Sequence, residues 1–379
     1  MRWARETAGL SVDDVVEKIN RVSVTAETVE SWENEESTAS PTYAQLERLA
    51  YDIYKRPLAI FFFPQPPQEV SPQQSFRTLP EYEIESMPPR VRFLLKKARA
   101  FQVNISELYD GVNPAERQIV NDLDFDVDTP AAEIAVAVRE YLGVSLDEQS
   151  ASRDAEQAFK LWRTRFENCG VSVFKDAFRE DSISGFCLYD ARFPLIYINN
   201  SKPFTRQSFT LFHELAHLLF ETGGIDAKLE HYIDHLEGEN RRIEVLCNRF
   251  AGEFLVPTHD FQQRIAGLQV DDYTIQELAN AYNVSREVVL RKFFDRGDVD
   301  QAFYDERVAA WGADVPVREP GGSYYANMGV YLSENYLDKA FNRYHQDQIG
   351  IDQLADYLGV KVKSIPGMEA VLYRRGTAA

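Results

Sequence analysis

Along the first sixty residues, apolar side chains recur every three or four positions, which is the spacing of amphipathic helices. Hydroxyl residues such as Ser11 and Thr25 stand where these stretches begin, and such residues cap helix N-termini. The pattern predicts a bundle of four short helices, at residues 2–8, 11–19, 25–32 and 40–54. A proline- and glutamine-rich break at residues 64–74 then marks the clearest domain boundary in the chain.

The pattern changes after Pro130. Two further helical stretches lead into three short runs of β-branched and aromatic residues, which are typical of strands. The predicted helices lie at 131–142 and 154–168, and the predicted strands lie at 171–174, 185–189 and 194–199.

A helix at residues 208–220 follows, and it is apolar on most of its circumference, so we expect it in the core. A polar loop at 221–240 separates it from another helix at 241–257. These elements predict an α+β unit. Because the chain beyond this unit has helical spacing to its end, the whole is expected to be α+β but mostly α.

Three stretches share one rhythm, a capped helix, a short turn and a second helix, which is typical of helix-turn-helix units and suggests regulation. They lie at 11–32, 274–294 and 350–365. We therefore divide the chain into a helix-turn-helix domain at 1–67, a linker with a basic helix at 68–128, an α+β core at 129–265 and a helical region at 266–379.

Composition and charge indicate the cellular compartment of the protein and the classes of partner that it can bind. The 379 residues carry a formal net charge of −19, which gives no overall attraction to nucleic acid or anionic membranes. Cys169, Cys187 and Cys247 form no framework of pairs, which suits a reducing compartment. The N-terminus has no apolar signal sequence, and the most apolar run, Leu58–Phe63, is too short to span a bilayer. We expect a cytoplasmic protein with no membrane partner.

The predicted core helix carries the pattern H-E-x-x-H, from His213 to His217. A spacing of four residues puts both imidazoles on one helix face, so that they can converge on one Zn²⁺ ion. Glu214 lies beside them and can accept a proton from a water that the ion activates. Two ordinary packed histidines are the alternative, but burying two His and a Glu side by side without a metal carries a desolvation cost.

A catalytic zinc site needs a third protein ligand and an open fourth position. Glu244, on the next predicted helix, is the best candidate, although Glu237 and Glu239 lie nearby in the sequence. Asn248 is one turn beyond Glu244 on the same face. It is expected to bond the outer nitrogen of His213 or His217, a contact that tunes metal affinity.

Other residues carry alternative roles. A Cys247 thiolate at the metal would hold the enzyme latent, whereas a small packed side chain is the simpler interpretation. His231 is a candidate to stabilise the oxyanion of a tetrahedral intermediate, and with His235 it repeats the four-residue spacing in a polar loop. Tyr197 and Asn199 are candidates to line a substrate cleft if a peptide pairs with the strand 194–199, which is otherwise a core strand.

Three segments together resemble the ImmA/IrrE family of zinc metallopeptidases. The segments are GFCLYDARFPLIYINNS, RQSFTLFHELAHLLF and IEVLCNRFAGEFLVP, in this order and at the family's spacing. The resemblance covers roughly residues 130–295, and an XRE-like helix-turn-helix domain is a frequent N-terminal companion of this peptidase. The resemblance implies a zincin-like core with His213, His217 and Glu244 as zinc ligands and Glu214 as general base.

The resemblance also implies a substrate class, because family members cleave helix-turn-helix repressors. We therefore expect a zinc endopeptidase that makes limited cuts in such a repressor, in a stress response, in mobile-element control or in toxin–antitoxin regulation. The alternative is a non-catalytic, zinc-containing transcriptional regulator or an antitoxin-like binding protein.

The expected recognition helix departs from the composition that DNA binding requires. The expected recognition helix and its flank, TAETVESWENEES, carry five glutamates and no Lys or Arg. Because DNA affinity depends largely on neutralising phosphates, this composition disfavours DNA binding and favours protein docking or a homodimer. A gel-shift assay at low salt tests this expectation, since tight sequence-specific binding would contradict it.

Overall fold

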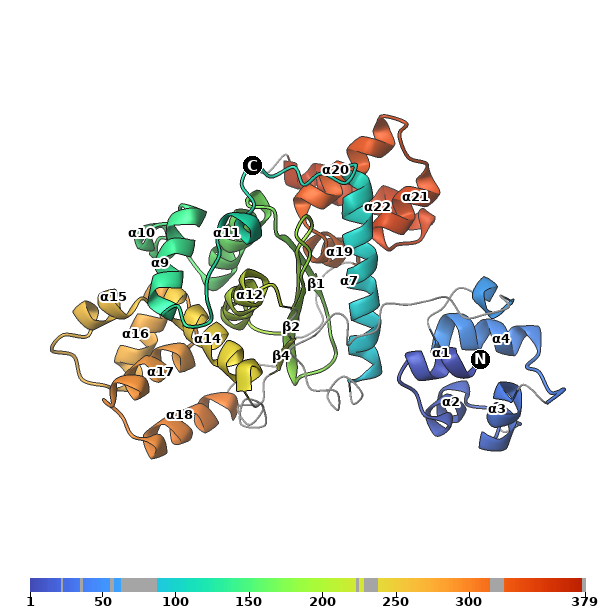
Figure 1. Cartoon of the computed structure of the whole chain (residues 1–379), viewed down its shortest axis with the longest axis horizontal. Helices are drawn as coiled ribbons and strands as arrows, with labels where there is room; N and C mark the ends of the chain where they lie inside the picture. The colour runs from blue at the N-terminus through green and yellow to red at the C-terminus, as the bar shows by residue number, and fades with distance from the viewer. Residues whose placement is uncertain are drawn as a thin grey trace. The chain divides into compact units, whose positions relative to one another are not determined.

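The computed structural model describes residues 1–21, 23–34, 37–54, 58–62, 87–222, 225–227, 238–313 and 324–376 (Figure 1). The chain divides into two compact units, Met1–Lys97 and Ala98–Ala379. The fold is α+β and mostly helical, with one small sheet in the second unit, as the sequence predicts. Our finer division into four domains stays a prediction. Within the described residues, no helix combines the length and apolar character that crossing a bilayer requires.

The first unit is a bundle of short helices. Ser11, Thr25 and Thr42 cap the second, third and fourth helices with their side-chain oxygens. The helices are α1 (Arg2–Thr7), α2 (Val12–Ile19), α3 (Ala26–Glu33) and α4 (Tyr43–Arg48), followed by the π-helical turn Leu49–Ile53 and the 3₁₀ turn Leu58–Phe62. Helix α7 (Pro89–Leu108) begins in this unit and ends in the second.

A buried ion pair ties the first helix of this unit to the third. Arg5 donates from Nε and Nη2 to the two carboxylate oxygens of Glu33, each at 2.8 Å. The Glu33 side chain is only 2% exposed, so it belongs to the core of the bundle. The acidic face of α3 that remains in solvent therefore comes from Glu27 and Glu30.

The second unit contains a four-stranded sheet with the order β1-β3-β2-β4. Strand β3 pairs in parallel with β1 and antiparallel with β2, and β4 pairs antiparallel with β2. The strands are β1 (Ser172–Asp176), β2 (Ile183–Leu188), β3 (Leu195–Asn199) and β4 (Ile225–Ala227). The sequence predicted the first three, but it assigned residues 221–240 to a loop, so β4 corrects that prediction.

Helix α12 (Phe204–Leu219) covers one face of the sheet, and α7 lies on the opposite side (Figure 1). Gly185 of β2 permits the close approach of α12. A Cβ atom at this position would come within 2.5 Å of Thr210 Cγ2 and within 3.0 Å of the Tyr197 carbonyl oxygen. The missing side chain of Gly185 thus sets how closely α12 packs on the sheet.

Helices on the far side of α12 complete the core. They are α9 (Ala131–Leu142), α11 (Ala155–Asn168) and α14 (Gly238–Leu255). Phe212 of α12 stacks on Phe254 of α14 at 4.0 Å between ring centroids, and Trp162 of α11 meets both rings edge-on. This aromatic core fixes α14 against α12.

The remaining helices of this unit are short. They are α8 (Ile119–Asp122), α10 (Leu146–Ser150), α15 (Thr258–Arg264), α16 (Asp272–Tyr282), α17 (Arg286–Arg296), α18 (Gln301–Ala313), α19 (Tyr324–Tyr331), α20 (Glu334–His345), α21 (Ile351–Leu358), the 3₁₀ turn Val362–Ser364 and α22 (Ile365–Gly376).

The C-terminal helices pack onto the sheet face that α12 does not cover. Tyr336 of α20 meets the rings of Phe174 on β1 and Phe101 on α7 edge-on, and these two rings stack at 4.7 Å. Arg163 of α11 donates to the main-chain oxygens of Val330 and Tyr331. Both faces of the sheet are therefore covered within the second unit.

Candidate functional site

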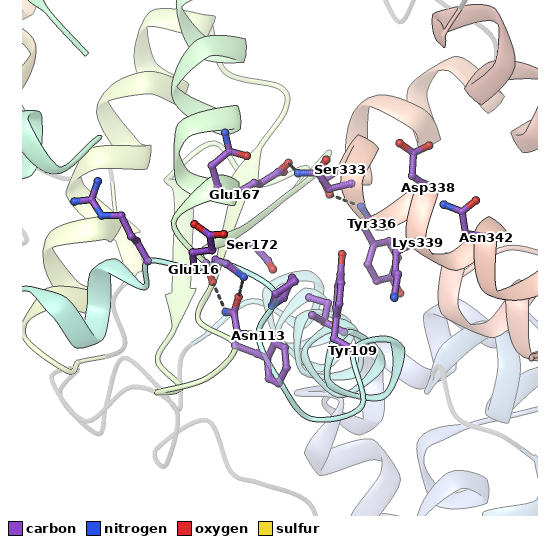
Figure 2. A pocket seen from close by; sticks show the side chains of 18 residues that line it. Tyr109, Asn113, Glu116, Glu167, Ser172, Ser333, Tyr336, Asp338, Lys339 and Asn342 are labelled. Atoms are coloured by element: carbon purple, nitrogen blue, oxygen red, sulfur yellow. Dashed lines mark hydrogen bonds between the residues drawn. The ribbon is translucent and has the colours of Figure 1, made fainter. Parts of the chain in front are cut away.

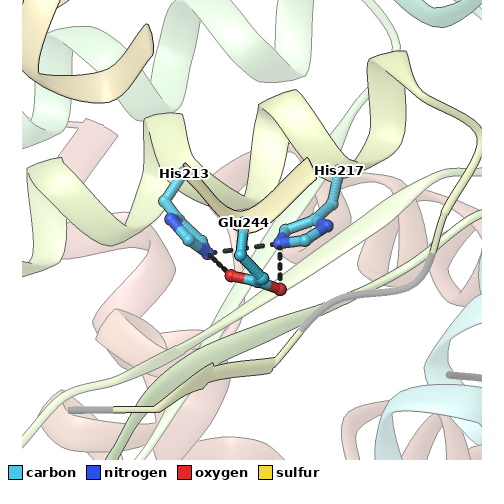
Figure 3. Close-up of side chains that lie close together, drawn as sticks. All are labelled: His213, His217 and Glu244. Atoms are coloured by element: carbon cyan, nitrogen blue, oxygen red, sulfur yellow. Dashed lines mark hydrogen bonds and ion pairs between the residues drawn. The ribbon is translucent and has the colours of Figure 1, made fainter. Parts of the chain in front are cut away.

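Three side chains from two helices meet in a buried cluster (Figure 3). His213 and His217 lie one turn apart on α12, and Glu244 reaches them from α14. The two Nε2 atoms are 3.2 Å apart. His217 Nε2 is 3.2 Å from Glu244 Oε1, and His213 Nε2 is 3.5 Å from Glu244 Oε2. The three residues are at most 4% exposed.

The local sequence explains half of this arrangement. The four-residue spacing puts both imidazoles on one face of α12. Glu244 joins them because the aromatic contacts between Phe212 and Phe254 hold α14 against α12. Of the acidic alternatives, Glu237 lies outside the described residues, and so does the side chain of Glu239.

The outer nitrogens of both imidazoles have hydrogen-bond partners. His213 Nδ1 is 3.1 Å from Asn248 Oδ1, an amide oxygen one turn beyond Glu244. His217 Nδ1 is 3.2 Å from Thr222 Oγ1. With Nδ1–H donating in both rings, the lone pair of each Nε2 atom is directed into the cluster.

Charge in the cluster favours an ionised carboxyl group. Burial raises the pKa of Glu244. Where the His217 and His213 rings carry a proton on Nε2, their charge and hydrogen bonds outweigh burial and hold the pKa below its usual range. One carboxylate oxygen and two imidazole nitrogens form the donor set of a divalent metal site such as zinc. The residues present therefore fit a metal ion.

Glu214 and Cys247 lie beside the cluster. Glu214 follows His213 on α12 and is 0% exposed. Cys247 is also fully buried, and burial together with Glu244 and Glu214 raises the pKa of its thiol well above the usual value. Its sulfur is not among the clustered ligand atoms of the described residues, so the structure does not place Cys247 where a latch on the metal requires it.

The predicted cleft strand needs a correction. Strand β3 lies between β1 and β2, so both of its edges are already paired and no peptide can add to it. Tyr197 is buried and stacks on Phe186. The Asn199 amide group accepts from Phe178 N and donates to the Ile183 carbonyl oxygen, so it organises the 178–183 loop. Both residues belong to the core and do not line a cleft.

Two expectations fall outside the described part of the chain. The candidate oxyanion residue His231 lies there, and so does His235, which repeats the metal-ligand spacing. Thr222, in contrast, lies within the described residues, and the sequence pattern did not identify it. The available signal was a hydroxyl residue five positions after His217, just past the end of the predicted helix.

A separate crevice of about 630 Å³ opens between α20, the end of α11 and the chain that follows α7 (Figure 2). Several of its polar groups already serve structural contacts. Asn113 donates to the Gly170 carbonyl oxygen, Asn335 donates to Glu167, and the Tyr336 hydroxyl donates to Tyr357 O. The crevice does not include the histidine cluster, and its chemistry belongs to the packing of the C-terminal helices.

Comparison with known proteins points to the same segment of chain. Residues 166–294 match the family model described as the IrrE N-terminal-like domain, a peptidase family. The matched segment is less than half of the chain, and it contains the whole histidine–glutamate cluster. No curated protein matches the chain. The match supports similarity to the ImmA/IrrE peptidases for this segment, and the segment contains a cluster of side chains that could hold a metal ion.

Proposed function

We propose that this chain is a zinc-dependent endopeptidase that makes limited cuts in a protein substrate, with His213, His217 and Glu244 as metal ligands. The supporting observation is the buried cluster, in which both imidazoles direct Nε2 toward one carboxylate while Asn248 and Thr222 occupy their outer nitrogens. Two packed histidines without a metal do not need this arrangement of donors.

A zinc ion held in this cluster would activate a water molecule and polarise the carbonyl group of the scissile bond. Glu214 is the proposed general base. Its carboxylate accepts the proton of the attacking water and then gives a proton to the departing amine. Its full burial beside the cluster strengthens electrostatic interactions, because bulk water is excluded.

The substrate strand is proposed to be β4 in place of β3. In the described part of the chain β4 pairs with β2 alone, and it stands at the end of the sheet order. It also packs against α12, the helix of the two histidines. An extended peptide that adds to its outer edge would pass along the cluster, held by main-chain hydrogen bonds.

The substrate class is proposed from the family resemblance, namely a helix-turn-helix repressor in stress response, mobile-element control or toxin–antitoxin regulation. A cytoplasmic location agrees with three buried, free cysteines. The N-terminal unit is proposed to dock protein in preference to DNA, because Glu27 and Glu30 of α3 are exposed and would repel phosphates.

The experiment combines metal analysis with a cleavage assay. Metal content is measured by mass spectrometry on the full chain and on His217→Ala, with His259→Ala as an exposed-histidine control. Cleavage is tested on helix-turn-helix repressors encoded beside the gene, with Glu214→Gln as the inactive control. We expect one zinc per chain in the wild type, in His259→Ala and in Glu214→Gln, and none in His217→Ala.

The outcomes separate the two function classes. Cleavage by the wild type that is lost in Glu214→Gln establishes the peptidase. Zinc binding without cleavage of any tested repressor favours the non-catalytic regulator. A wild-type protein without metal would overturn the proposal.

A further inference from the structure

Thr222 lies just beyond the C-terminal end of α12 and contacts His217 three times. Its backbone N–H donates to the His217 carbonyl oxygen at 2.8 Å. Its hydroxyl donates to the same oxygen at 3.0 Å. The hydroxyl oxygen is also 3.2 Å from Nδ1 of the imidazole ring. The chain can turn back in this way because Glu221 adopts a left-handed conformation, with φ of 54°.

The direction of the third contact follows from the second. A threonine hydroxyl has one hydrogen, which goes here to the His217 carbonyl oxygen. The same oxygen atom must therefore accept the contact from the ring, so Nδ1 carries the proton. This tautomer leaves the lone pair of His217 on Nε2, which is the atom inside the cluster.

Without a metal, the opposite tautomer is stabilised by a hydrogen bond. In that tautomer Nε2 carries the proton and can donate to Glu244 Oε1, which is 3.2 Å away. Thr222 opposes that tautomer, because its hydroxyl would have to leave the carbonyl oxygen and donate to Nδ1. The residue thus biases the ring toward the form that binds a metal ion.

Thr222 is itself anchored to the sheet. The Cys187 thiol of β2 lies 3.8 Å from the Thr222 carbonyl oxygen, in hydrogen-bonding geometry. Strand β4, which pairs with β2, begins at Ile225. The threonine therefore links three parts of the unit, namely the end of α12, strand β2 and the His217 ring. Asn248 of α14 makes the corresponding contact to His213, so the two rings are oriented by residues from different parts of the fold.

We propose that Thr222 is a positioning residue that sets the tautomer and ring orientation of His217 for metal binding. This inference rests on the proposed metal site. It assigns Thr222 no contact with substrate.

The test compares variants of the full chain. Thr222→Val removes the hydroxyl and keeps the shape, Thr222→Ala is a second variant without a hydroxyl, and Thr222→Ser keeps the hydroxyl. Thr164→Val is the matched control, because Thr164 Oγ1 also donates to a helix carbonyl oxygen at 3.0 Å, that of Lys160. Zinc affinity is measured by competition with a chromophoric chelator.

We expect Thr222→Val and Thr222→Ala to bind zinc about 10–100-fold more weakly than the wild type. Thr222→Ser and Thr164→Val should stay within about threefold of it. Circular dichroism of the metal-free proteins checks that all variants are folded.

A second readout needs no metal. In protein labelled with ¹⁵N-histidine, the His217 nitrogen shifts of the metal-free wild type should report Nδ1–H, and those of Thr222→Val should move toward the other tautomer. Unchanged shifts and unchanged zinc affinity in Thr222→Val would overturn the proposal. Equal weakening in Thr222→Ser would also overturn it, because the methyl group would then be responsible.

The two proposals fail differently. If the wild type binds no zinc, the proposed function fails with this inference. If the wild type and Thr222→Val bind zinc equally well, only the role of Thr222 fails.

Discussion

At the scale of single residues, two buried polar side chains of the second unit show how different partners stabilise a polar group inside the core. Asn199 uses both ends of its amide group on the backbone of one loop. Lys175 is 2% exposed, and its ammonium group lies 4.5 Å from the ring centre of Phe159 and 4.9 Å from that of Phe204. Sequence alone shows that such residues are polar, but not that they are inside.

The candidate site shows which contacts the local sequence pattern can predict and which it cannot. Placement of His213 and His217 on one face follows from their spacing. Their meeting with Glu244 depends on helix packing between residues far apart in sequence, so the sequence left Glu237 and Glu239 as alternatives. The Thr222 contact depends on a left-handed residue at a helix end, and no spacing rule identifies it in advance.

Gly185 gives a prediction at this scale. Because a Cβ atom would meet Thr210 Cγ2 at 2.5 Å, Gly185→Ala should push α12 away from the sheet and cost about 1–3 kcal/mol of unfolding free energy. Thermal unfolding should show a lower midpoint, by roughly 2–4 °C per kcal/mol. The double variant with Thr210→Ser, which lacks the clashing methyl group, should recover part of the loss. A neutral Gly185→Ala would contradict the packing argument.

At the scale of elements, the sequence located the long ones well. The predicted helix at 131–142 agrees with α9, and Asp154 caps α11 as a residue just outside it. Helix α12 begins four residues earlier than predicted, directly after Pro203. The sequence did not predict strand β4, because three residues carry too little periodicity. It did not predict the interior position of β3 either, because strand order is set by non-local pairing.

The C-terminal end of α14 depends on one buried glutamine. Gln149, which is 0% exposed, donates to the carbonyl oxygens of Leu255 and Tyr282, and its own oxygen accepts from Arg139. Gln149→Leu leaves two buried carbonyl groups unpaired, so we expect a loss of about 2–4 kcal/mol in chemical denaturation. Gln276→Leu, on the exposed face of α16, should change stability by less than about 0.5 kcal/mol. Similar effects of both variants would refute this assignment.

At the scale of the whole molecule, each unit has its own apolar core. In the second unit the C-terminal helices complete the cover of the sheet through Tyr336 and Arg163. Composition and helical spacing predicted the mostly helical character, but they carried no sign that residues beyond 324 pack against β1. That contact joins parts of the chain about 150 residues apart.

This contact should depend on pH through Glu167, whose side chain is 11% exposed. The pKa of Glu167 is raised to about 7. Burial is the main cause and Glu334 adds to it, against the opposite effects of Arg163 and Ser333. Since the pKa is raised in the folded state, the protonated carboxyl group is favoured there. Its effect is therefore a loss of stability as the pH rises from the unfolded pKa, near 4.5, to about 7.

Between pH 5 and pH 8, this group alone should lower the unfolding free energy by about 2 kcal/mol. Glu167→Gln should remove that part of the pH dependence, so the difference in thermal midpoint between variant and wild type should widen as the pH rises. Glu156→Gln, at an exposed position of the same helix, is the control. A pH-independent difference between Glu167→Gln and the wild type would show that Glu167 does not titrate in this range.

Arg163 secures the C-terminal helices through the main-chain oxygens of Val330 and Tyr331. A main-chain oxygen is available whatever side chain its residue carries. Positions 330 and 331 are therefore free to drift during evolution without loss of this contact, whereas the arginine is not. In related sequences, we expect arginine to be constant at position 163, whereas the side chains at positions 330 and 331 should vary.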